Sequence, residues 1–160
     1  MRTLVTSLLW FSAVGCGLTA GLYFAFSTFI MTALGRIDQA AGIAAMNAIN
    51  DVIVRSLFLP VFMGSTLTCL ALAVLAPFRW NEPGAAMWLA GSVLYVVGMF
   101  VVTMMFNVPL NNALAAVQPA SNEAGVSWAR YLADWTWWNH VRTVTSTLAF
   151  ALFIAAIAAR

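Results

Sequence analysis

LVTSLLWFSAVGCGLTAGLYFAFSTFIMTAL, residues 4–34, contains no charged side chain. As one helix rising about 1.5 Å per residue, this run is longer than the roughly 30 Å hydrocarbon core of a bilayer. A secretory signal has an apolar region of only about 7 to 15 residues, and this run continues well beyond Cys16, where the sequence faintly resembles a cleavage site. We therefore predict a retained membrane-spanning helix that tilts or protrudes.

The remainder of the chain has the same apolar character. Of its 160 residues, 63% are hydrophobic and 8% are charged, whereas soluble domains carry about 25% charged residues. The basic residues are scattered singly, which gives no electrostatic footprint for nucleic acid. The sequence predicts an all-α, integral membrane four-helix bundle that forms a single domain over residues 1–160. Its spans are expected at about residues 4–34, 56–78, 86–106 and 140–159.

Four spans place both termini on the same side of the membrane. Arginines occur in similar numbers on the two sides, so the positive-inside rule does not orient the chain by itself. All acidic residues except Glu82 lie opposite the termini, and we favour cytoplasmic termini. All basic residues are Arg and Ala is abundant, which suggests a GC-rich bacterial genome and hence a bacterial inner membrane.

Small residues repeat at a spacing of four on the first span. Gly17, Gly21 and Ala25 would lie on one helix face, where another helix can approach closely. This pattern is typical of two situations. The face packs inside the bundle, or it forms the contact of a homo-oligomer.

The connection between the first and second spans has the pattern of a short interfacial helix. Over residues 39–54 apolar side chains recur at helical spacing, while Asp51 and Arg55 form a favourable i, i+4 ion pair on another face. Such a helix presents a solvated face at the membrane surface. Asn50, one position from that face, could instead point into the bundle and bind a polar ligand.

The third span is followed by NVPLN, residues 107–111. Asn107 suits an N-cap and Pro109 suits a first helical turn, so we expect the span to end and a second short helix to start here. A broken helix frees backbone groups that must line a cavity or lie buried in protein. Asn107 and Asn111 are then candidate ligand-binding amides. The alternative is a capping residue and a surface residue.

SWARYLADWTWWNHVRT, residues 127–143, holds four Trp and the single His of the chain. Trp128, Trp135, Asn139 and Arg142 recur at spacings of seven, four and three, which makes one helical stripe. Aromatic residues also gather at membrane interfaces without any further role.

Arg142 and His140 are the ionisable residues at the start of the fourth span. An ionisable group inside a span predicts function, although an Arg can snorkel and a His can be satisfied by a Thr hydroxyl. Trp138 precedes Arg142 by four residues, which permits a cation–π contact. His140 lies about 100° around the helix from Asn139.

Several classes of site are disfavoured by the residue inventory. One His and few inward-facing acids cannot build a His-rich metal centre, and Cys16 and Cys69 show no zinc-binding spacing. No phosphate-binding glycine loop or serine nucleophile motif appears. We predict no metal site and no cofactor, while a haem held by a single His stays open.

Four motifs resemble one known family. They are GLYF at residues 21–24, MNAIN at residues 46–50, NVPLN at residues 107–111, and the spaced residues of WxxWNHxRT at residues 135–143. In combination they are similar to the anthrone-oxygenase-like family of small four-span membrane proteins, whose bacterial members largely form a domain of unknown function. The resemblance covers essentially the whole chain.

The resemblance implies an oxidoreductase that uses O2 to oxygenate an anthrone-like polycyclic phenolic or another lipophilic aromatic substrate, without a cofactor. His140 would be the base and Arg142 would stabilise the developing oxyanion. The other expected substrate contacts are hydrogen bonds from Asn50, Asn107, Asn111 and Asn139 and stacking walls formed by Trp135 and Trp138. The alternative is a non-enzymatic membrane module that binds a quinone-like ligand or a partner protein.

Overall fold

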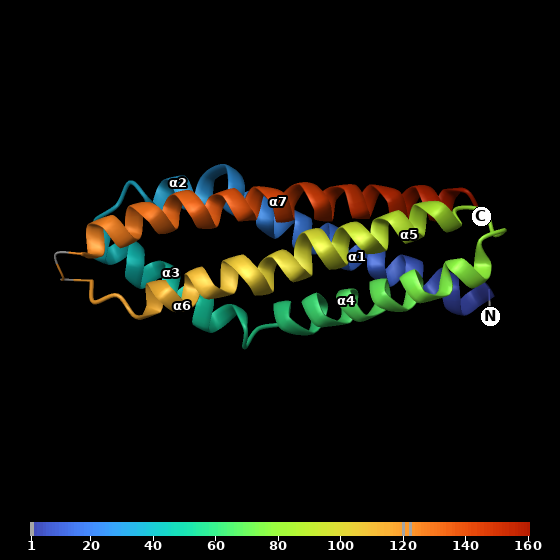
Figure 1. Cartoon of the computed structure of the whole chain (residues 1–160), viewed down its shortest axis with the longest axis horizontal. Coiled ribbons are helices and arrows are strands. Elements are labelled where there is room, and N and C mark those ends of the chain that lie inside the picture. Colours follow the sequence, from blue (N-terminus) through green and yellow to red (C-terminus); the bar gives the residue numbers. More distant parts are fainter. Residues whose placement is uncertain (1, 120, 122) are drawn as a thin grey trace.

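The computed structural model of the chain describes residues 2–119, 121 and 123–160. The described residues contain no strand, and four of their helices are long and apolar enough to cross a membrane. The predicted all-α, integral membrane four-helix bundle is therefore confirmed. Both termini lie at the same end of the elongated bundle (Figure 1). The four helices are Arg2–Leu34, Phe58–Leu75, Ala85–Ala115 and Ala124–Ala158.

The first long helix contains one π-helical turn, which is wider than an α-helical turn. It consists of α1 (Arg2–Ala25), the π-helical turn η1 (Phe26–Ile30) and α2 (Met31–Leu34). The small residues of α1 do not share one environment. A side chain at Gly17 would contact Phe150 of the last helix, α7 (Ala124–Ala158), whereas Gly21 is exposed and has no neighbouring side chain within 4 Å.

The third long helix is continuous where the sequence predicted a break. It consists of α5 (Ala85–Val93), two π-helical segments and α6 (Val108–Ala115), the π segments being η3 (Leu94–Val101) and η4 (Thr103–Asn107). Asn107 has helical dihedral angles and its side chain caps nothing, so the predicted N-cap is wrong. The amide of Val108 donates to the carbonyl of Thr103, five residues back. This wider turn accommodates Pro109 without ending the helix.

Helix α3 lies in the first connection, α4 is the second long helix, and a short turn follows α4. Asp38 caps α3 (Gln39–Ile53) by accepting a hydrogen bond from the amide of Ala41 at 3.1 Å, and α4 (Phe58–Leu75) follows. This confirms the helix expected in the first connection. A short 3-10 turn, η2 (Pro77–Arg79), links α4 to α5.

The fourth long helix is a single element, α7 (Ala124–Ala158). It contains both the aromatic segment and the last span, so one continuous helix carries the indoles and Arg142. At about 1.5 Å per residue it is much longer than the hydrocarbon core. α3 and α6 lie at the end of the bundle opposite the termini (Figure 1), and we expect this end to project beyond the apolar layer.

Two hydrophobic cores follow each other along the bundle. The larger contains Tyr23, Trp88 and Phe153 and lies between the four long helices. The smaller contains Phe26 and Trp135 and joins η1, α3, α6 and the first half of α7. Tyr23 and Phe26 are one helical turn apart, so the two cores meet at this level of the first helix.

At the other end of the bundle Glu82 links the η2 turn to the last residue of the chain. It accepts a hydrogen bond from Arg79 and pairs with Arg160 at 3.0 Å. The hydrogen bond from Arg79, followed by the positive charge of Arg160, lowers the pKa of the Glu82 carboxyl. Its contribution to stability is therefore present above the unfolded pKa of about 4.3 and is lost as the pH falls through the lower folded value.

We expect Glu82→Gln to be slightly less stable than the wild type at neutral pH, and we expect this difference to shrink as the pH falls toward 3. Thermal unfolding in detergent at pH 7, 4.5 and 3 measures this difference. Asp51→Asn is the control, because Asp51 pairs with the well-exposed Arg55. A difference between Glu82→Gln and the wild type that does not shrink in acid would contradict the proposed ion pairing.

Candidate functional site

A cavity of about 330 Å³ lies where the two cores meet. Its walls come from α1, η1, α3, the first turns of α4, η4, α6 and α7. Most of the lining side chains are aliphatic or aromatic. The side chains that bring polar atoms to it are Tyr23, Asn50, Thr103, Asn111, Trp135 and Arg142.

Arg142 is the dominant polar group of this cavity, although only 4% of it is exposed. Its Nη2 donates to Oδ1 of Asn139 at 2.8 Å and its Nη1 donates to Oγ1 of Thr103 at 3.4 Å, while Nε has no partner. The guanidinium carbon lies 4.3 Å from the ring centroid of Tyr23 and 4.9 Å from that of Trp135. Two aromatic rings and two neutral oxygens thus surround the cation.

No carboxylate in the described part of the chain forms an ion pair with Arg142. A buried charge without an opposite charge is costly. Cation–π contacts offset part of this cost, by about 2 kcal/mol or more when the contact is desolvated. A negatively charged oxygen of a ligand would offset more of it. The arrangement therefore suits the binding of an anion between apolar walls.

Asn139 positions Arg142 rather than lining the cavity. Its Nδ2 donates to the carbonyl of Tyr23 and to Oγ of Ser27, both at 2.8 Å, which leaves Oδ1 free to accept from Arg142. Ser27 is also hydrogen-bonded to Thr143 at 2.9 Å. This network joins α7 to the first helix at the level of the π-helical turn η1.

The three other asparagines of the predicted site occupy different positions relative to the cavity. Asn50 and Asn111 line the cavity. Asn50 has an unpartnered Nδ2, and Asn111 accepts a hydrogen bond from Tyr131 at 2.8 Å. Asn107 is buried behind the wall and donates to the carbonyl of Trp135 at 3.2 Å. Asn107 thus holds the backbone of α7 and does not line this cavity.

The inward stripe predicted on the fourth helix is confirmed. Trp128, Trp135, Asn139 and Arg142 are all buried. The tryptophans of the predicted site are separated, because Trp135 lines the cavity while Trp138 stacks on Phe106 outside it, with ring centroids 3.7 Å apart.

His140 lies on the exposed side of α7 and is not among the residues that line the cavity. Its neighbour Asn139 points inward, and successive helical residues differ by about 100° in direction. The structure therefore does not bring His140 and Arg142 together in one cavity. Within the described residues, no group of three His, Cys, Asp or Glu side chains could hold a metal ion.

Sequence reasoning missed Tyr23, Ser27 and Thr103. Tyr23 belongs to the GLYF motif, but nothing local indicates that its ring faces an arginine 119 positions away in the sequence (142 minus 23). Thr103 stands in a span without any charge, and such polar side chains point toward the bundle interior. That signal could have identified Thr103 but not its partner.

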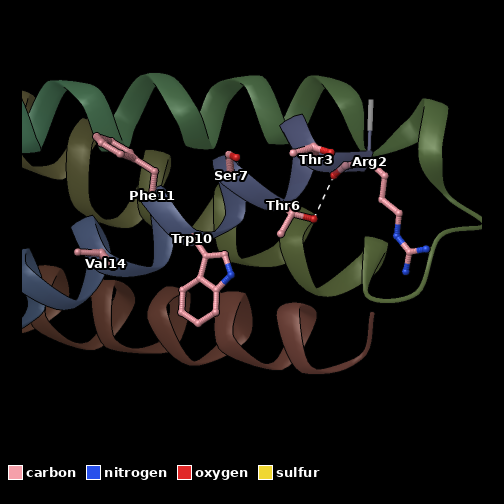
Figure 2. Close-up of a pocket in the computed structure, with 7 residues that line it drawn as sticks. All are labelled: Arg2, Thr3, Thr6, Ser7, Trp10, Phe11 and Val14. Atoms are coloured by element: carbon pink, nitrogen blue, oxygen red, sulfur yellow. Dashed lines mark hydrogen bonds between the residues drawn. The ribbon is translucent and has the colours of Figure 1, made fainter.

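A wider depression of about 750 Å³ lies at the opposite end, on the outer surface of α1. Figure 2 shows that Trp10 and Phe11 point away from each other there, and each is half exposed. This open surface faces the surroundings of the bundle, and its one charged lining residue is Arg2 at the edge. The enclosed cavity beside Arg142 is the stronger candidate for a functional site.

The profile of the anthrone oxygenase family matches residues 55–152, more than half of the chain. The chain belongs to the anthrone oxygenase family. No curated protein and no solved structure matches the chain. The family match includes Thr103, Asn111, Trp135 and Arg142, and it indicates an oxygenase-like or related function at family level.

Proposed function

We propose that this member of the anthrone oxygenase family oxygenates an anthrone-like polycyclic phenolic, or a similar lipophilic aromatic compound, with O2. The observation that carries the proposal is Arg142, a buried cation without a carboxylate partner in the described chain, held against an apolar cavity. Family membership supports the reaction class. The apolar walls support a lipophilic substrate.

An anthrone has an acidic doubly benzylic C–H bond, because loss of this proton gives an aromatic phenolate. A guanidinium fixed at the phenolate oxygen stabilises that anion strongly where water is excluded. Arg142 would therefore lower the pKa of the bound substrate and retain it as the anion. In this scheme the proton passes to water at the membrane boundary, outside the apolar cavity.

The electron-rich anion supplies the reducing power, so we propose that no cofactor is required. It transfers one electron to O2, and the two radicals combine to form a C–O bond at the benzylic carbon. The O–O bond then breaks as the second benzylic proton leaves, which gives a carbonyl and water. The sum is anthrone plus O2 giving anthraquinone plus water, in which the carbon is oxidised and O2 is reduced.

The other lining residues would orient the rings. Trp135 and Tyr23 hold the guanidinium between them and line the cavity with aromatic walls that a polycyclic ligand could contact. Asn50 and Asn111 bring amides to the same cavity. The unpartnered Nδ2 of Asn50 could donate to a second oxygen of the substrate.

Oxygen uptake by purified protein in lipid nanodiscs, given a simple anthrone, tests the proposal. Anthrones oxidise spontaneously, so empty nanodiscs provide the baseline. Acceleration above the baseline, with anthraquinone and water as products, is the expected result. Binding of an anthraquinone without any acceleration would support the alternative of a non-enzymatic ligand-binding module.

We expect His140→Ala to retain most of the activity, within about threefold of the wild type, because His140 lies outside the cavity. The base assigned from the sequence would instead account for about 10²-fold or more. The measurement is kcat for oxygen uptake across pH 6 to 9. A loss of two orders of magnitude would restore His140 as the base and place the reacting carbon on the outer face of α7.

A further inference from the structure

The cavity is enclosed by buried residues on one side and reaches the outer surface of the bundle on the other. Its residues from the first helix and α7, such as Tyr23 and Arg142, are buried. Four of its residues are also exposed on the outer surface, to between 39% and 52%. They are Val54, which follows α3, Leu59 and Met63 of α4, and Met104 of η4.

The open side reaches into the apolar layer at Leu59 and Met63. Helix α4 has 18 residues, which at about 1.5 Å each match the roughly 30 Å hydrocarbon core. Leu59 and Met63 occupy its first two turns, while the ion pair of Asp51 and Arg55 lies just before it. The opening is therefore placed just inside the boundary between acyl chains and headgroups.

The packing of α4 leaves the opening at its first two turns accessible. Its main contacts are with α1, α5 and η3. The cavity itself occupies the space between its first turns and η4. All four exposed rim residues are apolar, so the rim offers no hydrogen bond to water. Two of them are methionines, whose flexible side chains can move aside at low cost.

From these observations we infer that the ligand of Arg142 enters from the lipid phase, through a lateral opening between η4 and the start of α4 that Met63 and Met104 border. The inference rests on the proposed function of the same cavity and specifies its substrate class. The substrate is an amphiphilic aromatic that partitions into the bilayer with an ionisable oxygen near the headgroups.

The probe for this route is 1-hydroxyanthraquinone dissolved in vesicles, because its phenolate absorbs at longer wavelength than its phenol. Stopped-flow mixing of these vesicles with protein in vesicles follows loading of the site as growth of the phenolate band. We expect Met63→Trp to slow loading about tenfold, and Met63→Ala to load at least as fast as the wild type. Leu67→Trp, on the exposed face of α4 outside the cavity, is the matched control and should load normally.

A second probe, a sulfonated hydroxyanthraquinone that stays in water and shows the same kind of phenolate band, should load far more slowly than the lipophilic probe. Equal rates for the two probes, wild-type loading by Met63→Trp, or equal slowing by Met63→Trp and Leu67→Trp would each overturn the lateral route. The proposed function can fail separately. If Arg142→Ala keeps both the phenolate band and oxygen uptake, the proposed function of the cavity is wrong and this inference is wrong with it. If Arg142→Ala loses both while Met63→Trp loads normally, only the lateral route is wrong.

Discussion

Arg142→Ala is expected to lower kcat for anthrone oxygenation by about 10²-fold or more, the range found when one preorganised stabiliser of a developing anion is removed. Without the guanidinium the phenolate form of the substrate is no longer favoured in the apolar cavity, so little of it forms. Oxygen uptake and the phenolate band of a bound hydroxyanthraquinone measure the two effects independently. Both should disappear together.

Two further variants separate this role from a structural one. Arg142→Lys keeps the charge but not the flat surface between Tyr23 and Trp135, and we expect partial activity. Arg130→Ala is the control, because Arg130 lies on the same helix, is well exposed and pairs with Asp134 at the surface. It should behave as the wild type.

Arg142→Met should be as stable as the wild type or more stable, because it removes a buried charge that lacks an ionic partner. A structural arginine would behave in the opposite way. Thermal unfolding in detergent decides between them. A variant that is strongly destabilised and still binds the phenolate would contradict the anion-binding assignment.

Gly98→Val is expected to destabilise the fold strongly. A Cβ atom at Gly98 would lie 2.3 Å from Cγ2 and 2.6 Å from Cβ of Thr145, so η3 and α7 must move apart. Overpacking of this kind typically costs about 1–3 kcal/mol, and Val adds two more methyl groups to the clash. Activity should fall too, since Thr145 lies one turn from Arg142.

Unfolding by SDS titration, followed by helical circular dichroism, measures the loss. Gly21→Val is the matched control on the first helix, because Gly21 has open space around it. It should leave stability within about 1 kcal/mol of the wild type, as expected for a surface helix position. Equal stability of the Gly98 and Gly21 variants would show that the close approach of η3 and α7 is not required.

The most accurate predictions from the sequence concerned local patterns. The inward face of α7 was identified from the spacing of Trp128, Trp135, Asn139 and Arg142, because helical periodicity depends only on neighbouring residues. The break expected at Asn107 was wrong for the same kind of reason. Asn and Pro signal a helix start in isolation, but the π-helical turn of η4 absorbs the proline within a packed bundle.

The sequence by itself determined that this chain is an α-helical membrane protein, because runs of apolar residues without charge are stable only within a bilayer. It also indicated that Arg142 faces inward. Only the tertiary structure decided what surrounds that arginine. Tyr23, Thr103 and Trp135 come from three different long helices, and their meeting depends on how those helices pack, since side-chain contacts between distant segments leave no periodic trace in the sequence.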